Sequence, residues 1–178
     1  MKKLIPVIVL VVVVVAIVVA KKQGGPAAEV EPVVWYGMMP HPYISEVQSG
    51  AAAAEDAVGT KELKVVGQEW TQDNENANIK ALSTKGHKCF SVFPGDPAGA
   101  NGLFAQLVRN GQQVVAYGAE PNLPTPASFT VATHIHQAAT DACEKLVKMM
   151  GGKGNILNVL ETVTDVNTKV RDDAIIAV

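Results

Sequence analysis

The sequence predicts an α/β fold in which a parallel sheet carries helices on both faces. Short apolar runs rich in valine and aromatic residues alternate with amphipathic helical patterns between residues 33 and 117. Polar, turn-forming loops follow the apolar runs, and glycines follow several of the helical patterns. Strands that alternate with helices of about 10–15 residues are typical of βαβ units, which build parallel sheets.

The first unit, Val33–Gly50 with its continuation, sets the pattern. The apolar run Val33–Tyr36 predicts a buried strand, and the glycine and prolines of 37–42 end it. A helix is predicted over about Tyr43–Val58, because apolar residues recur there at intervals of 3, 4, 3 and 4. The residues expected to face inward are Ile44, Val47, Ala51, Ala54 and Val58.

Three further strands follow in the same rhythm. They are predicted at Leu63–Gln68, Lys88–Phe93 and Gln113–Tyr117. Asp73 is expected to cap the second helix, which runs to about Thr84 and is stopped by Gly86. Asp96 is expected to cap the third helix, with Pro97 at its first position. Inward positions in these two helices are Ile79, Leu82, Leu103, Phe104, Leu107 and Val108.

The rhythm breaks where three prolines, at 121, 124 and 126, fall within six residues, which suggests a crossing between lobes. A strand is predicted at Ser128–Thr133 and a helix at about Gln137–Met150. Another strand is predicted at Asn155–Leu160, and a last helix begins at Thr164 or Asp165. The helix over 137–150 is expected to bury Ala139, Cys143, Leu146 and Met150.

The N-terminus carries a targeting pattern. Lysine pairs flank Leu4–Ala20, seventeen residues without charge, which predicts a signal peptide or an N-terminal membrane anchor over 1–22, with membrane contact through residues 4–20. A buried strand is the less favoured alternative, because valine runs of this length rarely form one soluble strand. Residues 23–32 are interpreted as a linker.

Charge and cysteine content exclude some classes of partner. Without residues 1–22 the chain has 11 basic and 17 acidic residues, and no basic patch is present. Nucleic acid is therefore not expected as a partner. An exported chain could form a disulfide between Cys89 and Cys143, but two buried thiols are the default expectation, since one falls in a predicted strand and the other in a later helix.

Catalytic and cofactor-binding motifs are absent. No phosphate-binding G-x-x-x-x-G-K-[ST], no G-x-G-x-x-G after the first strand and no G-x-S-x-G occurs. His134 and His136 have no further metal ligands at suitable spacing nearby, so they are interpreted as ordinary histidines. The sequence therefore predicts a binding protein with no enzymatic activity, cofactor or metal.

Right-handed crossovers place all the loops that follow parallel strands at one edge of the sheet, where ligands bind in open α/β folds. These loops cover 37–43, 69–73, 94–97, 118–122 and 161–167. Their candidate binding residues are His41, Tyr43, Trp70, Asp96, Glu120, Asp165 and Asn167. Asp96 is more easily explained as a helix cap, and Trp70 could equally cover the surface of the lobe.

Several stretches resemble a known family. The turn Pro94-Gly95-Asp96, the strand Gln113–Tyr117 and above all GGKGNILNVLE followed by TVTDVNTK are similar to the periplasmic sugar-binding proteins of ABC importers, of the ribose, rhamnose and autoinducer-2 receptor type. The resemblance covers about residue 33 to the end. It implies the type I periplasmic-binding-protein fold, in which two lobes close on a sugar. Residues 33–126 would form a near-complete N-terminal lobe and 127–178 the beginning of a second, truncated lobe.

The resemblance also implies site residues. Tyr43 would stack on a sugar ring, although a core position at the helix start is an equal alternative. Asp165 and Asn167 would hydrogen-bond to sugar hydroxyls, although Asp165 could instead only cap the last helix. His41 faces the same edge. The aspartate that the family places directly after the fourth strand is missing, because Gly118 and Ala119 stand there and Glu120 follows.

Three functions follow from these features. The first is an extracytoplasmic solute-binding protein, periplasmic or extracellular, that captures a sugar or sugar-like ligand for an ABC permease. The second is a membrane-tethered ligand-sensing receptor domain of the same fold, which would retain residues 4–20. A flavodoxin-like or nucleotide-using enzyme is the third, and the missing phosphate loop argues against it.

Overall fold

A computed structural model describes residues 31–161 and 165–178, which belong to one compact unit. The export segment predicted at 1–22 and most of the predicted linker lie outside the described residues. In the part of the chain that is described, no helix has the length and apolar character needed to cross a membrane.

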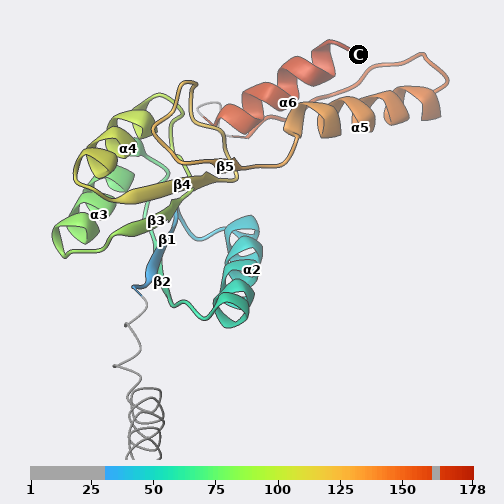
Figure 1. Cartoon of the computed structure of the whole chain (residues 1–178). Coiled ribbons are helices and arrows are strands. Elements are labelled where there is room, and N and C mark those ends of the chain that lie inside the picture. Colours follow the sequence, from blue (N-terminus) through green and yellow to red (C-terminus); the bar gives the residue numbers. More distant parts are fainter. Residues whose placement is uncertain (1–30, 162–164) are drawn as a thin grey trace, which may run out of the picture. The chain divides into compact units, whose positions relative to one another are not determined.

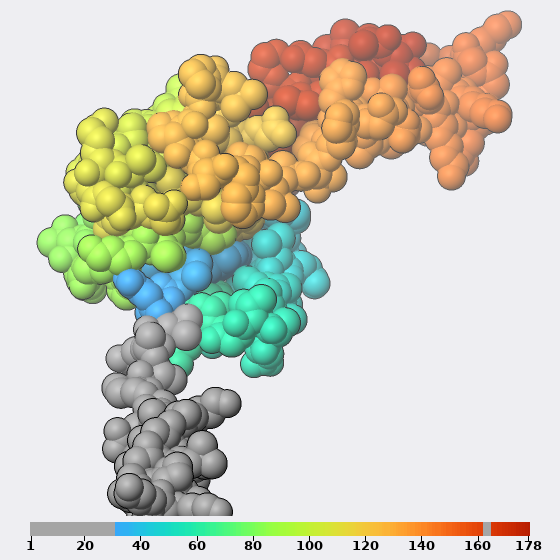
Figure 2. All heavy atoms as spheres, in the orientation of Figure 1, coloured from blue at the N-terminus to red at the C-terminus, as the bar shows by residue number. Residues whose placement is uncertain are grey.

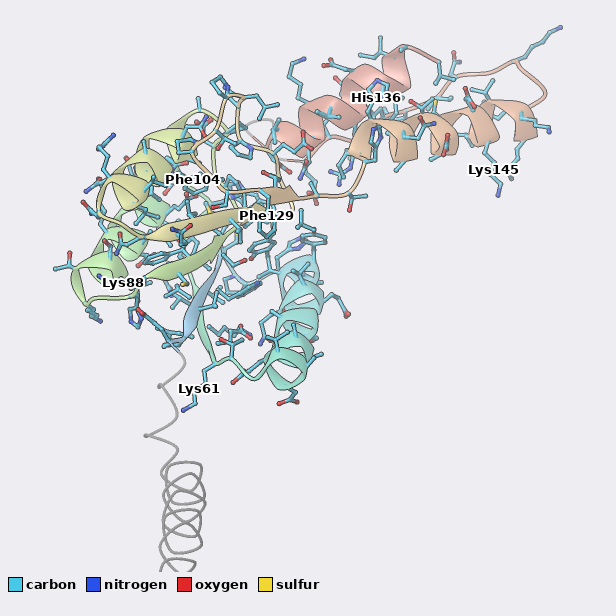
Figure 3. The ribbon with its side chains drawn as sticks, viewed as in Figure 1. Lys61, Lys88, Phe104, Phe129, His136 and Lys145 are labelled. Carbon is cyan, nitrogen blue, oxygen red and sulfur yellow. The ribbon has the colours of Figure 1, made fainter. Side chains whose placement is uncertain are left out.

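The sheet has five strands in the order β2-β1-β3-β4-β5, and all neighbouring strands pair in parallel. This confirms the predicted α/β fold. Val33 is in register with Glu62 on one side and Cys89 on the other, so β1 lies inside the sheet. Lys61 and Lys88 precede β2 and β3 and mark the amino-terminal edge, opposite the edge with the candidate loops (Figure 3). The strands are β1 (Val33–Gly37), β2 (Glu62–Val66), β3 (Cys89–Val92), β4 (Gln113–Tyr117) and β5 (Thr130–Val131).

Helix α2 (Pro42–Val58) covers one face of the sheet, and α3 (Gln72–Thr84) and α4 (Gly99–Arg109) cover the other (Figure 1). Because helices cover both faces of the sheet, successive residues of β1 are buried whichever face they point to. Val34, Trp35 and Tyr36 are accordingly all buried. Phe104 of α4 is fully buried (Figure 3). The predicted inward positions of α3 are confirmed, but two of α2 and one of α4 are exposed: Ala54, Val58 and Val108.

Two predicted helix caps differ from the structure. Thr71, not Asp73, is the N-cap of α3, because its Oγ1 accepts a hydrogen bond from the Asn74 N–H at 3.2 Å. Asp73 lies in the first turn instead, where a negative charge is favourable near the helix N-terminus. Asp96 does accept hydrogen bonds from the Ala98 and Gly99 N–H groups, but α4 begins at Gly99, two residues after the predicted Pro97.

The C-terminal part contains α5 (Ile135–Met149) and α6 (Val166–Ile176). The two helices pack side by side, with the atoms of α6 (red) against those of α5 (orange) in Figure 2. Cys143 is the residue of α5 that is buried, whereas Leu146 is 42% exposed, contrary to expectation.

Strand β5 is shorter than predicted and pairs with β4 in the same sheet. The lobe boundary at residue 127 stays a prediction.

The strand predicted at Asn155–Leu160 does not form; the segment is irregular. A strand requires a neighbour whose backbone groups complete its hydrogen bonds, and within the described residues none pairs with this segment. Its apolar side chains therefore stay exposed, Leu157 by 88% and Val159 by 82%. Cys89 in β3 and Cys143 in α5 are both free thiols, as expected, although only Cys143 is buried and Cys89 is partly exposed.

A buried carboxyl group, that of Glu75, connects α3 to the loop after β3. Its side chain is fully buried, and Oε2 accepts a hydrogen bond from the Gly95 N–H at 2.6 Å, while Oε1 is buried without a partner. Burial raises the pKa of Glu75 to about 7, and the nearby Asp96 adds to the shift. Glu75 thus holds the 94–96 turn in place at the edge of the sheet that carries the candidate loops.

The Glu75 carboxyl should make stability depend on pH. Its pKa is higher in the folded chain than the ordinary value of 4.5, so the folded state retains a proton that the unfolded state loses. Stability should therefore fall as pH rises from about 4.5 through about 7, by up to about 3 kcal/mol. Glu75→Gln keeps an acceptor for Gly95 and should remove much of this loss, as measured by urea unfolding at pH 5 and pH 8.

The matched control for this experiment is Glu46→Gln, which changes an exposed glutamate of α2. It should leave the pH dependence of the unfolding free energy as it is in the parent. Equal pH dependence in the parent and in Glu75→Gln would show that Glu75 does not hold a proton in the folded chain.

Candidate ligand-binding cleft

A cleft of about 1070 Å³ lies at the carboxyl-terminal edge of the sheet. The loops after β1, β2, β3 and β4 line one side of it, and residues of α5, of α6 and of the irregular segment between them line the other. This is the edge that the sequence predicted for a ligand, because parallel strands with right-handed crossovers bring their following loops together. The lining residues from the sheet edge include Met39, His41, Tyr43, Trp70, Phe93 and Gly118.

Aromatic rings form the sheet side of the cleft. Phe93, directly after β3, meets Tyr43 and Trp70 edge to face, with ring centroids 6.3 and 5.2 Å apart. Behind it, Tyr117 of β4 packs on the Phe93 ring at 5.6 Å. Trp70, whose role the sequence left open, therefore belongs to this wall, and Phe93 is a lining residue that the sequence analysis did not single out. Phe93 is the last residue of the apolar run at 88–93, and this run predicted only a position in the core for it.

Two buried tyrosines support the wall from within the sheet. The Tyr117 hydroxyl donates a hydrogen bond to the Tyr36 carbonyl oxygen at 2.9 Å. Burial raises the pKa values of both Tyr117 and Tyr36 above the ordinary value of 10.0. The phenols are therefore neutral, and they contribute hydrogen bonds and packing to the wall without adding charge.

His41 and Tyr43 are positioned by the start of α2. The His41 Nδ1 atom caps the helix by accepting a hydrogen bond from the Tyr43 N–H at 3.1 Å. An Nδ1 atom that accepts carries no proton, so the neutral ring has its N–H at Nε2. Tyr43 is 42% exposed and lines the cleft, with an edge contact to Phe93. Its ring is placed to offer a face or its hydroxyl to a ligand.

Gly118 follows β4 at the position where the resembled family has an aspartate. Its φ of +76° favours glycine, and a Cβ atom there would lie 2.5 Å from the Phe93 ring. The close approach of Phe93 to the backbone therefore requires a residue without a side chain. Glu120, predicted as a binding residue on this loop, has an exposed side chain and is not among the residues that line the cleft.

The start of α6 supplies polar groups on the opposite side. Asp165 is the N-cap, which the sequence analysis gave as the alternative to a ligand contact, and its Oδ1 accepts a hydrogen bond from the Asn167 N–H at 3.0 Å. Asn167 Nδ2 donates to the Gly118 carbonyl oxygen at 3.2 Å, which joins α6 to the sheet edge. Both residues line the cleft, as do Glu161 and Arg171, which the sequence analysis did not select. The signal for Arg171 was spacing, because it lies four residues after Asn167 on the same helix, and Glu161 falls within the candidate loop 161–167.

The histidine pair of the second half has a structural place. His134 is the N-cap of α5, and its Nδ1 accepts from the Gln137 N–H at 3.4 Å. His136 follows in the first turn of α5 (Figure 3). Within residues 31–161 and 165–178, no three histidine, cysteine, aspartate or glutamate side chains gather in an arrangement that could hold a metal ion.

Known structures share this fold at low sequence identity. An ABC transporter solute-binding protein from Burkholderia graminis C4D1M, in complex with D-arabinose, is 20% identical with a TM-score of 0.78, over 86% of this chain and 53% of that one. The periplasmic binding protein component of the arabinose ABC transporter from Shewanella sp. ANA-3, bound to α- and β-L-arabinofuranose, is 13% identical with a TM-score of 0.74, over 81% and 48%.

A third similar structure is the fructose-binding periplasmic domain of a hybrid two-component system, 9% identical with a TM-score of 0.74, over 83% of this chain and 49% of that one. Identities this low establish the fold only. The chain spans about half the length of these structures. The search of curated proteins found no match.

The family is established by sequence. A family model described as the periplasmic binding protein domain matches residues 33–178, which is most of the chain and contains every element of the sheet and the cleft. The predicted resemblance is thereby confirmed at the level of the family, whose members bind ligands and are not enzymes. This chain belongs to the periplasmic binding protein domain family.

Proposed function

We propose that this chain is an extracytoplasmic solute-binding protein that captures a sugar or sugar-like molecule in the cleft and delivers it to an ABC permease. The observation that carries the proposal is the composition of the cleft. Aromatic rings from the sheet edge and polar side chains at the start of α6 line one space of about 1070 Å³, together with apolar side chains of α5 and of residues 156–157. A sugar has C–H-rich ring faces for the first and hydroxyl groups for the second.

The proposed ligand contacts are Tyr43 and His41 on the sheet side and Asp165 and Asn167 on the α6 side. Tyr43 offers its ring, and the His41 Nε2–H offers a donor, because Nδ1 is held by the helix cap. Asp165 and Asn167 offer oxygen atoms that are not used by the bonds already described. Glu120 is left out of the proposed contacts, because its side chain does not line the cleft.

A membrane-tethered sensor of the same fold is the second candidate. It is favoured by the similarity to the fructose-binding periplasmic domain of a hybrid two-component system. Both candidates place the cleft outside the cytoplasm and require export, which the lysine-flanked apolar run at residues 4–20 predicts. They differ in the partner that responds to the ligand-bound protein, which is a permease in the first and a signalling protein in the second. Neighbouring genes for a P-loop ATPase and a multi-span permease would favour transport, and a neighbouring signalling kinase would favour the sensor.

Sugar binding is tested by calorimetric titration of the full-length protein with neutral pentoses and hexoses, beginning with D-arabinose, L-arabinose, D-fructose and D-glucose. Saturable binding of at least one is expected. Titrations without heat of binding across this panel, with the protein shown to be folded by circular dichroism, would reject the proposed sugar ligand.

Tyr43→Ala should weaken binding of that sugar because it removes the ring that stands beside Phe93. A loss of about 1–3 kcal/mol, or roughly ten- to a hundredfold in the dissociation constant, is expected for a ring that stacks and also donates a hydrogen bond. Tyr43→Phe is the matched control, because it keeps the ring and removes only the hydroxyl group. It should retain most of the affinity, and a loss equal to that of Tyr43→Ala would assign the contact to the hydroxyl group alone.

Asp165→Asn should separate ligand binding from helix capping. Asparagine caps helices about as well as aspartate, so α6 should keep its start and the unfolding free energy should change little. The charged acceptor for sugar hydroxyls is lost, however, so the dissociation constant should rise by about tenfold. If affinity stays at the parent value in the calorimeter, Asp165 serves only as the cap.

A further inference from the structure

The turn that follows β3 is tied to the start of α3 by two hydrogen bonds. The Gly95 N–H donates to Glu75 Oε2 at 2.6 Å, and the Asp96 N–H donates to Gln72 Oε1 at 3.0 Å. This turn comes directly after Phe93, whose ring contacts the other aromatic residues of the cleft. The position of the Phe93 ring therefore depends on how α3 holds the turn.

The space around the Glu75 carboxyl group is filled. A Cβ atom at Gly95 would lie 2.5 Å from Met38 Cε and 3.0 Å from Glu75 Oε2. The side chains of Met38 and Glu75 are both fully buried, and Glu75 Oε1 has no hydrogen-bond partner among the described residues. Water can therefore reach Oε1 only if the turn after β3 or the Met38 side chain moves.

The two protonation states of Glu75 differ in what they require from this site. A protonated carboxyl group can stay buried, whereas a carboxylate needs water or other donors for both oxygen atoms. The titratable groups that face it are Tyr36 of β1 and Asp96 of the turn, and neither supplies a positive charge. Within the described part of the chain, no ion pair involves Glu75. Burial raises its pKa to about 7, so both states are populated near neutral pH.

We infer that Glu75 is a positioning residue of the cleft, whose protonated carboxyl group holds the turn after β3 and the Phe93 ring in the arrangement that binds a ligand. Ionisation draws water to Oε1 and moves the turn away from α3. Phe93 lies two residues before Gly95 and contacts Tyr43 and Trp70, so the shift reaches side chains that line the cleft.

The effect on the ligand, which rests on the proposed function, has a defined sign. A ligand that binds the protonated form more tightly raises the pKa of Glu75 further in the bound state. Affinity is therefore complete at pH values below the pKa of about 7 and falls as the pH rises above it.

His41 would produce the opposite trend. Its Nδ1 accepts the hydrogen bond from the Tyr43 N–H, and a protonated ring can only donate, so protonation removes this helix cap. An effect of His41 would weaken binding as the pH falls, whereas the effect of Glu75 weakens binding as the pH rises. The direction of the pH profile therefore separates the two residues.

The ligand part is tested by calorimetry on the full-length protein at pH 6, 7 and 8, with D-arabinose, L-arabinose, D-fructose and D-glucose. The dissociation constant of the sugar that binds best should rise by about three- to tenfold from pH 6 to pH 8. Glu75→Gln keeps an acceptor for Gly95 and cannot ionise, so its dissociation constant should change by less than about twofold over this range. Thermal unfolding at each pH shows that the fold is kept.

The matched control is Asp73→Asn, which removes an exposed carboxyl group from the first turn of the same helix. It should retain the pH profile of the parent. A control that loses the profile as Glu75→Gln does would overturn the assignment to Glu75.

The arrangement of the cleft is tested without a ligand by NMR on the full-length protein. The signals of the Gly95 amide and the Trp70 indole N–H should shift together as the pH is raised, with a midpoint of about 7 in the parent. Both signals should lack this shift in Glu75→Gln. A shift of the Gly95 signal alone would show that ionisation does not reach the cleft and would overturn the inference.

The outcomes separate this inference from the proposed function. If the parent binds a sugar equally well at pH 6 and pH 8, or if Glu75→Gln keeps the pH profile of the parent, Glu75 does not position the cleft, although sugar binding stands. If the parent binds none of the sugars, the proposed function is rejected, and the NMR titration alone decides whether Glu75 positions the cleft.

Discussion

Phe93 is the contact on which the candidate cleft depends. Its ring meets Tyr43 at the start of α2, Trp70 after β2 and Tyr117 at the end of β4, so it joins segments from every part of the sheet edge. Its backbone N–H also donates to the Tyr36 carbonyl oxygen of β1 at 3.1 Å. Edge-to-face aromatic pairs contribute about 0.5–1.5 kcal/mol each beyond the area that they bury. Three such pairs on one ring fix the loops relative to one another before any ligand arrives.

The absence of a side chain at Gly118 follows from the same ring. Because Phe93 approaches the backbone there, a Cβ atom at residue 118 would collide with it. The loop after β4 thus cannot present a side chain directly above Phe93, and its carbonyl oxygen is taken by Asn167. In the proposed function, polar recognition therefore lies at the start of α6, whereas sequence reasoning noticed Gly118 only as a departure from the family's aspartate.

The elements that the sequence predicted well are those defined by local rules. Strand β4 has the predicted bounds, because a buried apolar run is decided by neighbouring residues. The cap at Asp165, one of two roles considered for this residue, is decided in the same way. The segment 155–160 has an equally apolar pattern and is irregular, since pairing depends on another strand. Likewise Thr71 and Asp73 are both competent caps, and only the path of the loop after β2 selects Thr71. Phe93 and Arg171 needed the assembled edge to be placed in the cleft.

Few contacts join α6 to the sheet edge. In the described residues one hydrogen bond, from Asn167 to the Gly118 carbonyl oxygen, joins them, together with the packing of Val166 against the core. A neutral hydrogen bond contributes only about 1 kcal/mol. The proposed ligand, stacked on Tyr43 and held by Asp165, would contact both sides at once, so its differential affinity for a closed arrangement would exceed that link. Under the proposed function, such a balance would let a permease or a sensor partner distinguish the occupied state from the empty one.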